Sequence, residues 1–407
     1  MKGERDWGRE AADRLARLSK ISAPGPGVTR LPFTPHHRAA LDVLSDWMRE
    51  AGLDVHLDAA GTLVGRLPGP PGSRTLLIGS HQDSVREGGA FDGIMGVVLP
   101  ILAIERLRAD GETPPFTVEI LAFADEEGVR FPTALMGPRA LAGTFDPAVL
   151  DMTGDTGESL RKAMRDFGLD PDAVAALQRD PGSIIGYLET HIEQGPVLEA
   201  EGEAVGVVTA ICGIERHQVT FSGETGHAGT LPMDMRRDAL VAAAALISEV
   251  DHRARAEPGL LGTVGTLSIA PGAVNAVPRE ARLTVELRAP EDAVREQAGA
   301  VLSDFARAIA DERGLGLEMT RSYQQPAAPC DAALTETLAQ AVRAVGGRGL
   351  ALPSGATHDA SAMADLCPIA MLFVRCEAGV SHRPEEHATA ADMGVAIEAI
   401  CAFLRAL

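Results

Sequence analysis

The chain has 407 residues, of which 45% are hydrophobic and 23% charged, a composition typical of a soluble globular protein long enough for two domains. Its formal net charge of -20 argues against binding to nucleic acid or to anionic membranes, because both need cationic patches. An acidic chain that binds an anionic substrate needs local cations, so individual arginines become informative.

Cysteine usage and the absence of export signals indicate the cytoplasm. The five cysteines are odd in number and form no CxxC pair, as expected of reduced thiols. Residues 1–20 lack the apolar region of a signal peptide and predict an amphipathic helix. The longest apolar stretch, residues 94–104, is too short to span a bilayer and contains Pro100.

Strands and helices alternate in the first half of the chain. Residues 75–80 predict a buried strand, 94–110 a helix and 116–125 a second strand. Residues 146–180 are polar and helical, and the strand-like run 184–195 follows them. Such alternation predicts an α/β domain with a largely parallel sheet, whose ligands collect at the carboxyl ends of the strands.

The pattern changes near Ile211. Residues 215–326 predict the order strand, helix, strand, strand, helix, strand, which is the split βαβ unit of a small separate domain. A helix at 331–347 and a buried strand at 368–377 then return to the first domain. We therefore expect a main α/β domain formed by 1–211 and 327–407, with a small domain, 212–326, inserted in it.

Histidines and acids gather where the predicted strands run into loops. In chain order they are His81, Asp83, Asp92, Asp125, Glu126, Glu127, His191 and His382. Mixed imidazole and carboxylate ligands suit zinc, manganese or cobalt better than magnesium. Two such ions about 3.5–4 Å apart need a bridging group, and a carboxylate such as Asp92 can bridge where a histidine cannot.

Neighbouring residues predict supporting roles. Adjacent side chains in "DEE" point different ways, so one glutamate can bind a metal while the other acts as a general base. Asp83 lies two residues from His81 and could accept its second ring N–H. Each feature also has an ordinary structural explanation, such as a hydrogen-bonded histidine or a solvated turn. Spacing alone does not decide between a metal site and these explanations.

Seven motifs carry a family resemblance. They are "GSHQDSVREGGAFDG", "FADEEGVRFP", "ETHIEQGPVLE", "GETGHAGTLPMDMRRDAL", "PGAVNAVP", "SGATHDASAMA" and "GVSHRPEE". In this order the chain closely resembles, from about Arg30 to the C-terminus, the N-carbamoyl-L-amino-acid hydrolase and allantoate amidohydrolase family. This family is a ureido-cleaving branch of the dinuclear aminoacylase and carboxypeptidase superfamily. The resemblance implies a catalytic domain with an inserted lid and dimerisation domain.

The resemblance also implies a metal centre. Asp92 would bridge two divalent ions, zinc or manganese with cobalt or nickel as alternatives. His81 and His191 would complete one site, Glu127 and His382 the other, and Glu126 would be the general base. Related peptidases tend to carry an acid at the position of His191, so this histidine favours an amidohydrolase.

The small domain would supply the substrate contacts. His227, which could also be an ordinary loop histidine, would polarise the scissile carbonyl and stabilise the oxyanion. Asn275 and Arg288 would bind the substrate carboxylate, although they could be only a turn residue and a strand-end charge. Gln194 is a further candidate contact. In relatives the small domain forms the dimer interface, so we expect a homodimer, in which His227 and Asn275 could act across subunits.

Three positions depart from the family pattern or compete with it. Thr357 stands where the family has glycine, which affects the shape of the substrate loop. His358 could contact substrate or brace this loop, and the sequence supports both equally. His387 is a second histidine in "SHRPEEH", but His382 follows the motif "GVS" directly and is the preferred ligand.

The implied activity is hydrolysis of a ureido C–N bond in a carboxylate-bearing small molecule, by a metal-bridged hydroxide that Glu126 activates. The sequence does not choose between allantoate and an N-carbamoyl-L-amino acid. The alternative is an aminoacylase or dipeptidase of the same superfamily, against which His191 argues. An inactive binding protein and a nucleic-acid partner are disfavoured by the intact ligand set and by the negative charge.

Overall fold

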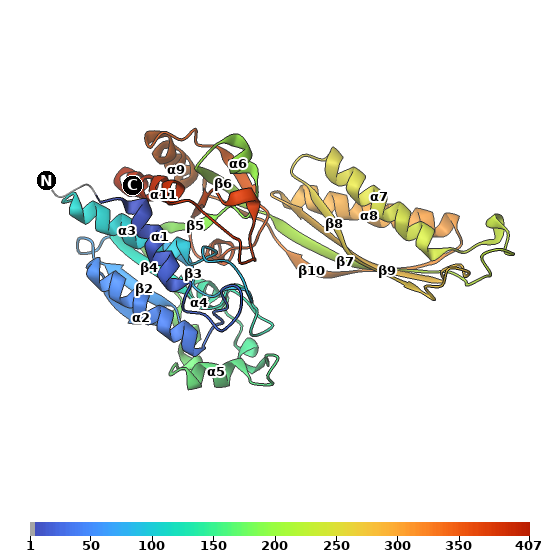
Figure 1. Cartoon of the computed structure of the whole chain (residues 1–407), viewed down its shortest axis with the longest axis horizontal. Coiled ribbons are helices and arrows are strands. Elements are labelled where there is room, and N and C mark those ends of the chain that lie inside the picture. The colour runs from blue at the N-terminus through green and yellow to red at the C-terminus, as the bar shows by residue number, and fades with distance from the viewer. Residues whose placement is uncertain (1–4) are drawn as a thin grey trace. The chain divides into compact units, whose positions relative to one another are not determined.

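The computed structural model describes residues 5–407, which form two compact units (Figure 1). The large unit comprises the residues up to Thr209 together with Pro329–Leu407. The small unit is the segment Ala210–Ala328. The small unit is thus an insertion between two parts of the large one.

Within the described residues the large unit contains a nine-stranded sheet of order β1-β2-β4-β3-β5-β13-β6-β11, with β12 paired to β6. The strands are β1 Asp54–Leu57, β2 Leu63–Leu67, β3 Thr75–His81, β4 Thr117–Phe123, β5 Ile184–Ile192, β6 Val205–Ile211, β11 Ala328–Pro329, β12 Ala351–Ser354 and β13 Ile369–Val374. Strands β4, β3, β5 and β13 are parallel neighbours. Their carboxyl ends therefore meet at one edge of the sheet.

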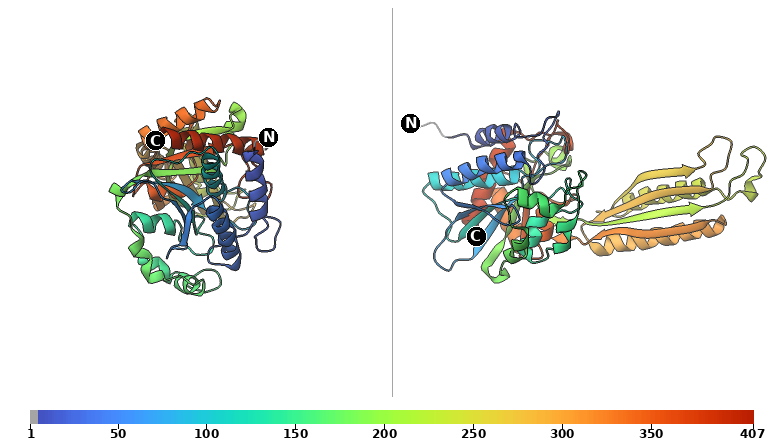
Figure 2. Two further views of the ribbon diagram at one scale, coloured as in Figure 1. Left: turned by 90° about the vertical axis from the view of Figure 1, so that its left-hand side faces the viewer. Right: turned by 90° about the horizontal axis from the view of Figure 1, so that it is seen from below.

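Helices cover both faces of this sheet (Figure 2). One face shares a core with α1 Trp7–Leu18, α2 Pro35–Glu50, α3 Met95–Ala109, α9 Ala332–Ala344 and α11 Ala390–Ala406. Helix α10 Asp359–Met363 packs against β5 and β13, and α4 Met136–Ala142 packs against α10. The other short elements are α5 Leu160–Asp166, α6 Val197–Glu201, η1 Pro147–Asp151, η2 Pro171–Leu177, η3 Pro181–Ser183 and η5 Glu377–Gly379. Burial on both faces explains why the central strands are continuous apolar runs.

The small unit is a four-stranded antiparallel sheet of order β10-β7-β9-β8, formed within residues 213–325. Its elements are β7 Gly213–Ser222, η4 Met233–Met235, α7 Ala239–Ala256, β8 Leu261–Ala270, β9 Glu280–Ala289, α8 Asp292–Glu312 and β10 Gly316–Gln325. Alternate residues of β9 are buried, because Leu283, Val285 and Leu287 share a core with α7 and α8. The two helices run along this sheet in Figure 1.

The predicted fold class is confirmed: a mostly parallel α/β sheet flanked by helices, with a separate small antiparallel sheet. The segment 146–180 contains one α-helix, α5, together with η1 and η2. The predicted N-terminal helix is observed as α1, while residues 1–4 lie outside the described residues. All five cysteines are described and unpaired. Across residues 5–407, no helix has both the length and the apolar character needed to cross a membrane.

Candidate metal centre and substrate-binding residues

Side chains at the carboxyl ends of the four parallel strands converge on one point. His81 is the last residue of β3, His191 lies near the end of β5, and Glu126 and Glu127 follow β4. Asp92 lies in the loop before α3, and His382 in the loop after β13. Three groups of these residues have ligand atoms within 4.8 Å of one another: His81, Asp92 and His191; His81, Glu126 and Glu127; and Asp92, Glu127 and His382. The structure therefore brings together all five predicted ligands.

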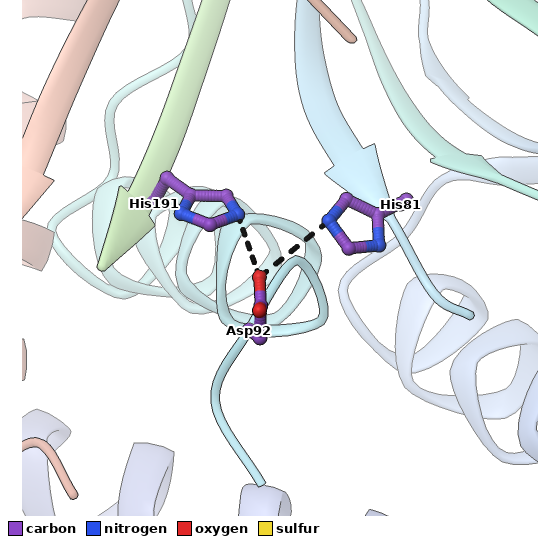
Figure 3. A group of neighbouring side chains, drawn as sticks. All are labelled: His81, Asp92 and His191. Atoms are coloured by element: carbon purple, nitrogen blue, oxygen red, sulfur yellow. Dashed lines mark ion pairs between the residues drawn. The ribbon is translucent and has the colours of Figure 1, made fainter. Parts of the chain in front are cut away.

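The two carboxylate oxygens of Asp92 face different histidines. Oδ1 lies 2.9 Å from Nε2 of His191 and 3.7 Å from Nε2 of His81 (Figure 3). Oδ2 lies 3.2 Å from Nε2 of His382. A carboxylate with one oxygen in each of two ligand groups has the arrangement that a bridge between two cations requires.

Backbone carbonyls select the ring tautomers of the two buried histidines. Nδ1 of His81 lies 3.1 Å from the carbonyl oxygen of Asp83, and Nδ1 of His191 lies 2.9 Å from that of Ile192. A ring N–H that donates to these carbonyls leaves the lone pair of Nε2 directed at Asp92. Lone pairs and a carboxylate oxygen that face one another need a positive charge between them, which a ring proton or a bound metal ion can supply.

The donor set therefore fits divalent cations that prefer nitrogen and oxygen ligands. Oε1 of Glu127 is buried and has no hydrogen-bond partner among the described residues, although it lies 3.9 Å from Nε2 of His382. An ion bound by Asp92, Glu127 and His382 would satisfy this oxygen, so the residues fit a metal at this position too.

The close packing of the ligands depends on unusual backbone conformations. Gly93 has φ 64°, and a Cβ atom there would lie 2.3 Å from the ring of His81, so only glycine fits. His382 and Gln194 are left-handed without being glycine, with φ 58° and 57°. Such residues persist only where the surrounding contacts hold them, and they concentrate at functional sites.

Asp83 organises the segment that carries the two glutamates. Its carboxylate accepts the backbone N–H groups of Glu126 at 3.1 Å and Glu127 at 3.3 Å. The sequence predicted a contact between this carboxylate and the second ring nitrogen of His81. Oδ1 of Asp83 does lie 3.4 Å from Nδ1 of His81, but the Asp83 carbonyl oxygen is closer. Asp83 thus links the His81 strand to the glutamate pair.

The electrostatics of the site favour bound cations. Desolvation raises the pKa of Glu126 well above its usual value, and it raises the pKa of Glu127 to about 7. The hydrogen bond to Asp92 raises the pKa of His382 to about 9. These shifts describe an acidic cluster that holds protons when no other positive charge neutralises it.

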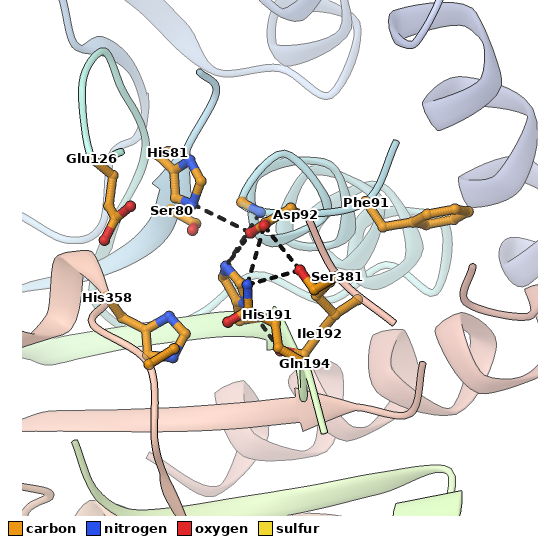
Figure 4. Close-up of polar contacts among 12 residues, drawn as sticks. Ser80, His81, Phe91, Asp92, Glu126, His191, Ile192, Gln194, His358 and Ser381 are labelled. Atoms are coloured by element: carbon orange, nitrogen blue, oxygen red, sulfur yellow. Dashed lines mark hydrogen bonds and ion pairs between the residues drawn. The ribbon is translucent and has the colours of Figure 1, made fainter. Parts of the chain in front are cut away.

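Gln194 and Ser381 complete the surroundings of Asp92 (Figure 4). The side-chain amide of Gln194 donates to Oδ2 of Asp92 at 3.1 Å and to Oγ of Ser381 at 3.0 Å. Gln194, predicted as a substrate contact, therefore holds Asp92 in this structure. Neither Ser381 nor Glu386, which it contacts, is singled out by the sequence pattern. Their only signal is that both belong to the motif "GVSHRPEE".

The other two histidines that the sequence motifs single out in the large unit, His358 and His387, lie in different surroundings. His358 is buried, its ring centroid lies 4.5 Å from that of His191, and its Nε2 lies 2.7 Å from Oγ of Ser354. Burial lowers its pKa well below the usual value, so it is neutral and packs against a predicted ligand. His387 packs edge-on against Phe91 and belongs to none of the described groups that could hold a metal.

In the small unit, His227 and Asn275 are neighbours. His227 pairs with Ala276, and the N–H of Ala228 donates to the carbonyl oxygen of Asn275 at 2.9 Å. The side chains of His227 and Asn275 are exposed. The guanidinium of Arg236 donates to the carbonyl oxygen of Ala228 at 2.6 Å and so fixes the loop that carries His227.

Arg288 lies at the opposite end of the small unit. It pairs with Ile214 on β7, and its guanidinium donates to Oε1 of Glu286 at 2.8 Å. Strand β9 begins at Glu280, beyond which His227 and Asn275 lie. Eight residues separate Glu280 from Arg288, which corresponds to about 26 Å along an extended strand. One small unit therefore holds the predicted substrate contacts at two distant ends.

The chain is similar to known proteins over nearly its whole length. A model of peptidase family M20/M25/M40 matches residues 77–406. An N-carbamoyl-L-amino acid amidohydrolase of Geobacillus stearothermophilus is 40% identical over 402 residues, which cover 98% of this chain and 97% of that protein. An allantoate deiminase of Arabidopsis thaliana is 37% identical, with coverage of 97% and 81%. The solved structure of an amidase of the hydantoinase/carbamoylase family from Burkholderia multivorans has 32% identity, a TM-score of 0.92 and coverage of 98% and 97%.

Proposed function

Because the chain belongs to peptidase family M20/M25/M40, we propose that it is a dinuclear metal amidohydrolase that cleaves the ureido C–N bond of a carboxylate-bearing small molecule. The observation that carries the proposal is the arrangement of Asp92, whose two oxygens face His191 and His382 separately. Relatives named for N-carbamoyl-L-amino acids and for allantoate support a ureido substrate over the amide substrate of an aminoacylase or dipeptidase.

Five residues would hold the metals. Asp92 would bridge the ions, with His81 and His191 on one of them and Glu127 and His382 on the other. The mixed nitrogen and oxygen donors suit zinc or manganese, with cobalt or nickel as alternatives. Bound ions supply Lewis acids that polarise a carbonyl and lower the pKa of water.

Glu126 would perform the proton transfers. Its side chain lies in a group with His81 and Glu127, and desolvation favours its protonated form. A carboxylate with a raised pKa can accept the proton of the attacking water near neutral pH. Protonated Glu126 can then deliver that proton to the leaving nitrogen. Hydrolysis of an N-carbamoyl amino acid would give ammonia, carbon dioxide and the amino acid, and hydrolysis of one ureido group of allantoate would give ammonia, carbon dioxide and a ureido amino acid.

The small unit would bind and polarise the substrate. Arg288 offers a planar guanidinium that matches a carboxylate, and Asn275 adds a hydrogen bond. His227 would stabilise the negative charge that develops on the carbonyl oxygen. Because Arg288 lies about 26 Å along β9 from Glu280, the end of the strand beyond which His227 lies, His227 and Arg288 cannot both act on one substrate from the same chain. We therefore propose that His227 and Asn275 act in the site of a second subunit.

If His227 and Asn275 act in the site of a second subunit, the protein must be a homodimer. An edge strand of the small unit is the candidate for the dimer interface. Strand β8 is an edge strand whose sequence "LGTVGTLSIA" contains no charged residue and no proline. Leu267 and Ile269 on it are 46% and 42% exposed. An uncharged edge strand with exposed apolar residues is suited to pair with another chain.

The location of the enzyme in the cytoplasm, which the sequence led us to expect, stays a prediction.

Ammonia release from a small substrate panel tests the function. The panel contains allantoate, N-carbamoyl-L-amino acids, N-carbamoyl-β-alanine and N-acetyl amino acids, each with the metal-loaded protein. We expect release of ammonia from a ureido substrate and no cleavage of N-acetyl amino acids. Cleavage of the N-acetyl compounds without release of ammonia from any ureido compound would instead identify an aminoacylase.

A further inference from the structure

A buried glutamate outside the predicted ligand set joins two loops of the metal centre. Glu386 is 4% exposed and follows the loop of His382. Its Oε1 accepts the backbone N–H groups of Phe91 at 2.9 Å and Asp92 at 3.0 Å, and its Oε2 accepts the hydroxyl of Ser381 at 3.1 Å. One carboxylate therefore holds the backbone of the bridging aspartate and the residue next to His382.

We infer that Glu386 is a positioning residue that sets the affinity of the metal site formed by Asp92, Glu127 and His382, an inference that rests on the dinuclear function proposed above. Glu386 touches no atom that would bind a metal or substrate. It acts through the two loops that it joins, which lie almost 300 residues apart in the sequence.

The packing around Glu386 is specific. A Cβ atom on Gly89 would lie 2.1 Å from Oε1 of Glu386 and 2.2 Å from its Cδ, so any larger residue at position 89 would displace the carboxylate. Gly89 thus allows the close approach of this side chain to the loop that leads to Asp92. Gly89 is the second glycine of "REGGAFDG", and this contact explains why the position is a glycine: a side chain there would collide with Glu386.

The effect should be selective for one of the two metal sites. His81 and His191 lie on β3 and β5, whose positions are fixed by parallel pairing with neighbouring strands. His382 lies in a loop, has φ 58°, and its side chain is 52% exposed. Its position depends on local contacts such as the bond between Ser381 and Glu386. Loss of Glu386 therefore loosens the His382 site more than the site of the two strand histidines.

The chemistry of the contacts predicts what a conservative change would do. Glutamine keeps one carbonyl oxygen, which can still accept the N–H groups of Phe91 and Asp92. Its NH₂ group can donate to the hydroxyl oxygen of Ser381, which reverses that bond without losing it. Alanine removes all three bonds and leaves the two N–H groups without their acceptor.

Metal titration of the full-length protein tests the inference. The variants Glu386→Ala and Glu386→Gln are stripped of metal with a chelator, titrated with Co²⁺ in a calorimeter, and assayed for bound metal by elemental analysis. The matched control is Glu385→Ala, because Glu385 is the adjacent glutamate, has a 65% exposed side chain and pairs only with Arg383 among the described ion pairs.

We expect two ions in the wild type and in Glu385→Ala. In Glu386→Ala one ion should bind as in the wild type while the other binds about 10–100-fold more weakly, as is common when a residue supporting a ligand is removed. Glu386→Gln should restore most of this affinity. In a His382→Ala background, Glu386→Ala should cause no further loss, because both changes act on the same site.

Unchanged affinities in Glu386→Ala, or an equal loss at both sites, would overturn the inference while leaving the dinuclear function intact. A wild type that binds fewer than two ions would overturn both. If Glu386→Ala does not fold, Gly89→Ala provides the same test, because a Cβ atom at position 89 would displace the carboxylate of Glu386. Selective weakening of one ion in Gly89→Ala supports the inference, and wild-type affinity for both ions contradicts it.

Discussion

Glu126 and Glu127 are adjacent in the sequence, but the structure places their side chains in different surroundings. Glu127 belongs to candidate metal groups with His81 and with Asp92 and His382, whereas Glu126 belongs only to the group with His81. Both are held through their N–H groups by Asp83, so their side chains diverge from one fixed segment. At the scale of single residues, this divergence separates a proposed ligand from a proposed general base.

The substitution Glu126→Gln should separate proton transfer from metal binding. Glutamine has nearly the same size but cannot accept a proton from water, so we expect kcat to fall by about 10²–10⁴-fold. Metal content, measured by elemental analysis, should stay at the wild-type level. The matched variant Glu127→Gln should lose metal, because it changes a proposed ligand. Wild-type turnover in Glu126→Gln would refute the assignment of the base.

A second residue-scale prediction concerns Asp58, in the turn between β1 and β2. Its Oδ1 accepts the N–H groups of Ala60 and Thr62, and burial raises its pKa to about 6. A carboxyl whose pKa is raised on folding binds protons more tightly in the native state. The free energy of unfolding should therefore fall as pH rises from about 4 to about 6.

Asn at position 58 keeps the acceptor oxygen and carries no charge. We expect Asp58→Asn to be more stable than the wild type by about 1–3 kcal/mol at pH 7.5, and this advantage should disappear near pH 4. Thermal unfolding at the two pH values provides the measurement, within the pH range where both proteins unfold reversibly. Asp54→Asn, a change at an exposed acid of β1, serves as the control and should show no such advantage. An advantage for Asp58→Asn that is equal at both pH values would contradict the prediction.

At the scale of elements, the two edge strands of the small sheet, β8 and β10, differ in how well they are protected from pairing with another chain. Strand β10 carries Glu318 and Arg321, and charged residues discourage an edge from pairing with another chain. Strand β8 has no charge over ten residues. Both edges belong to the same sheet, so the contrast favours β8 over β10 as the edge that forms the proposed dimer.

A charge on β8 should therefore weaken the dimer. We expect Leu267→Lys to shift the protein toward the monomer in analytical ultracentrifugation, since two lysines would oppose each other across a symmetric interface. Thr320→Lys places the same charge on β10 and should leave the association unchanged. Dissociation by the β10 variant alone would indicate that the other edge forms the interface.

At the scale of the whole molecule, the central question is which chain completes which site. Arg288 lies near one end of β9, His227 lies beyond the other end, and the predicted ligands lie in the large unit. A site shared between subunits makes a specific prediction for mixtures of inactive variants, because one chain can supply what the other lacks.

His227→Ala and Glu126→Gln should each be nearly inactive alone. When the two are co-expressed, hybrid dimers contain one site with both an intact Glu126 and a His227 from the partner. Random assembly gives half hybrids, each with one of two sites complete, so activity should recover to about a quarter of the wild type. Purification with two different tags isolates the hybrids for the kinetic assay. No recovery in pure hybrids would show that His227 acts within its own chain.

The sequence predicted the fold class and the family resemblance, and both are confirmed. The central strands were predictable because burial on both faces makes them continuous apolar runs. Strands β1 and β2 were not predicted, since they are short, with four and five residues. The polar segment 146–180 was expected to be helical, yet only α5 is an α-helix there.

By itself the sequence determined which residue types stand at strand ends, because local apolar runs and motifs report strands and the loops that follow them. Only the tertiary structure decided that the two oxygens of Asp92 face different histidines, and that His358 packs against His191. It also decided that Glu386 reaches the backbone of Asp92. These contacts join residues up to about 300 positions apart, and their geometry depends on sheet order and side-chain packing, which local sequence patterns do not encode.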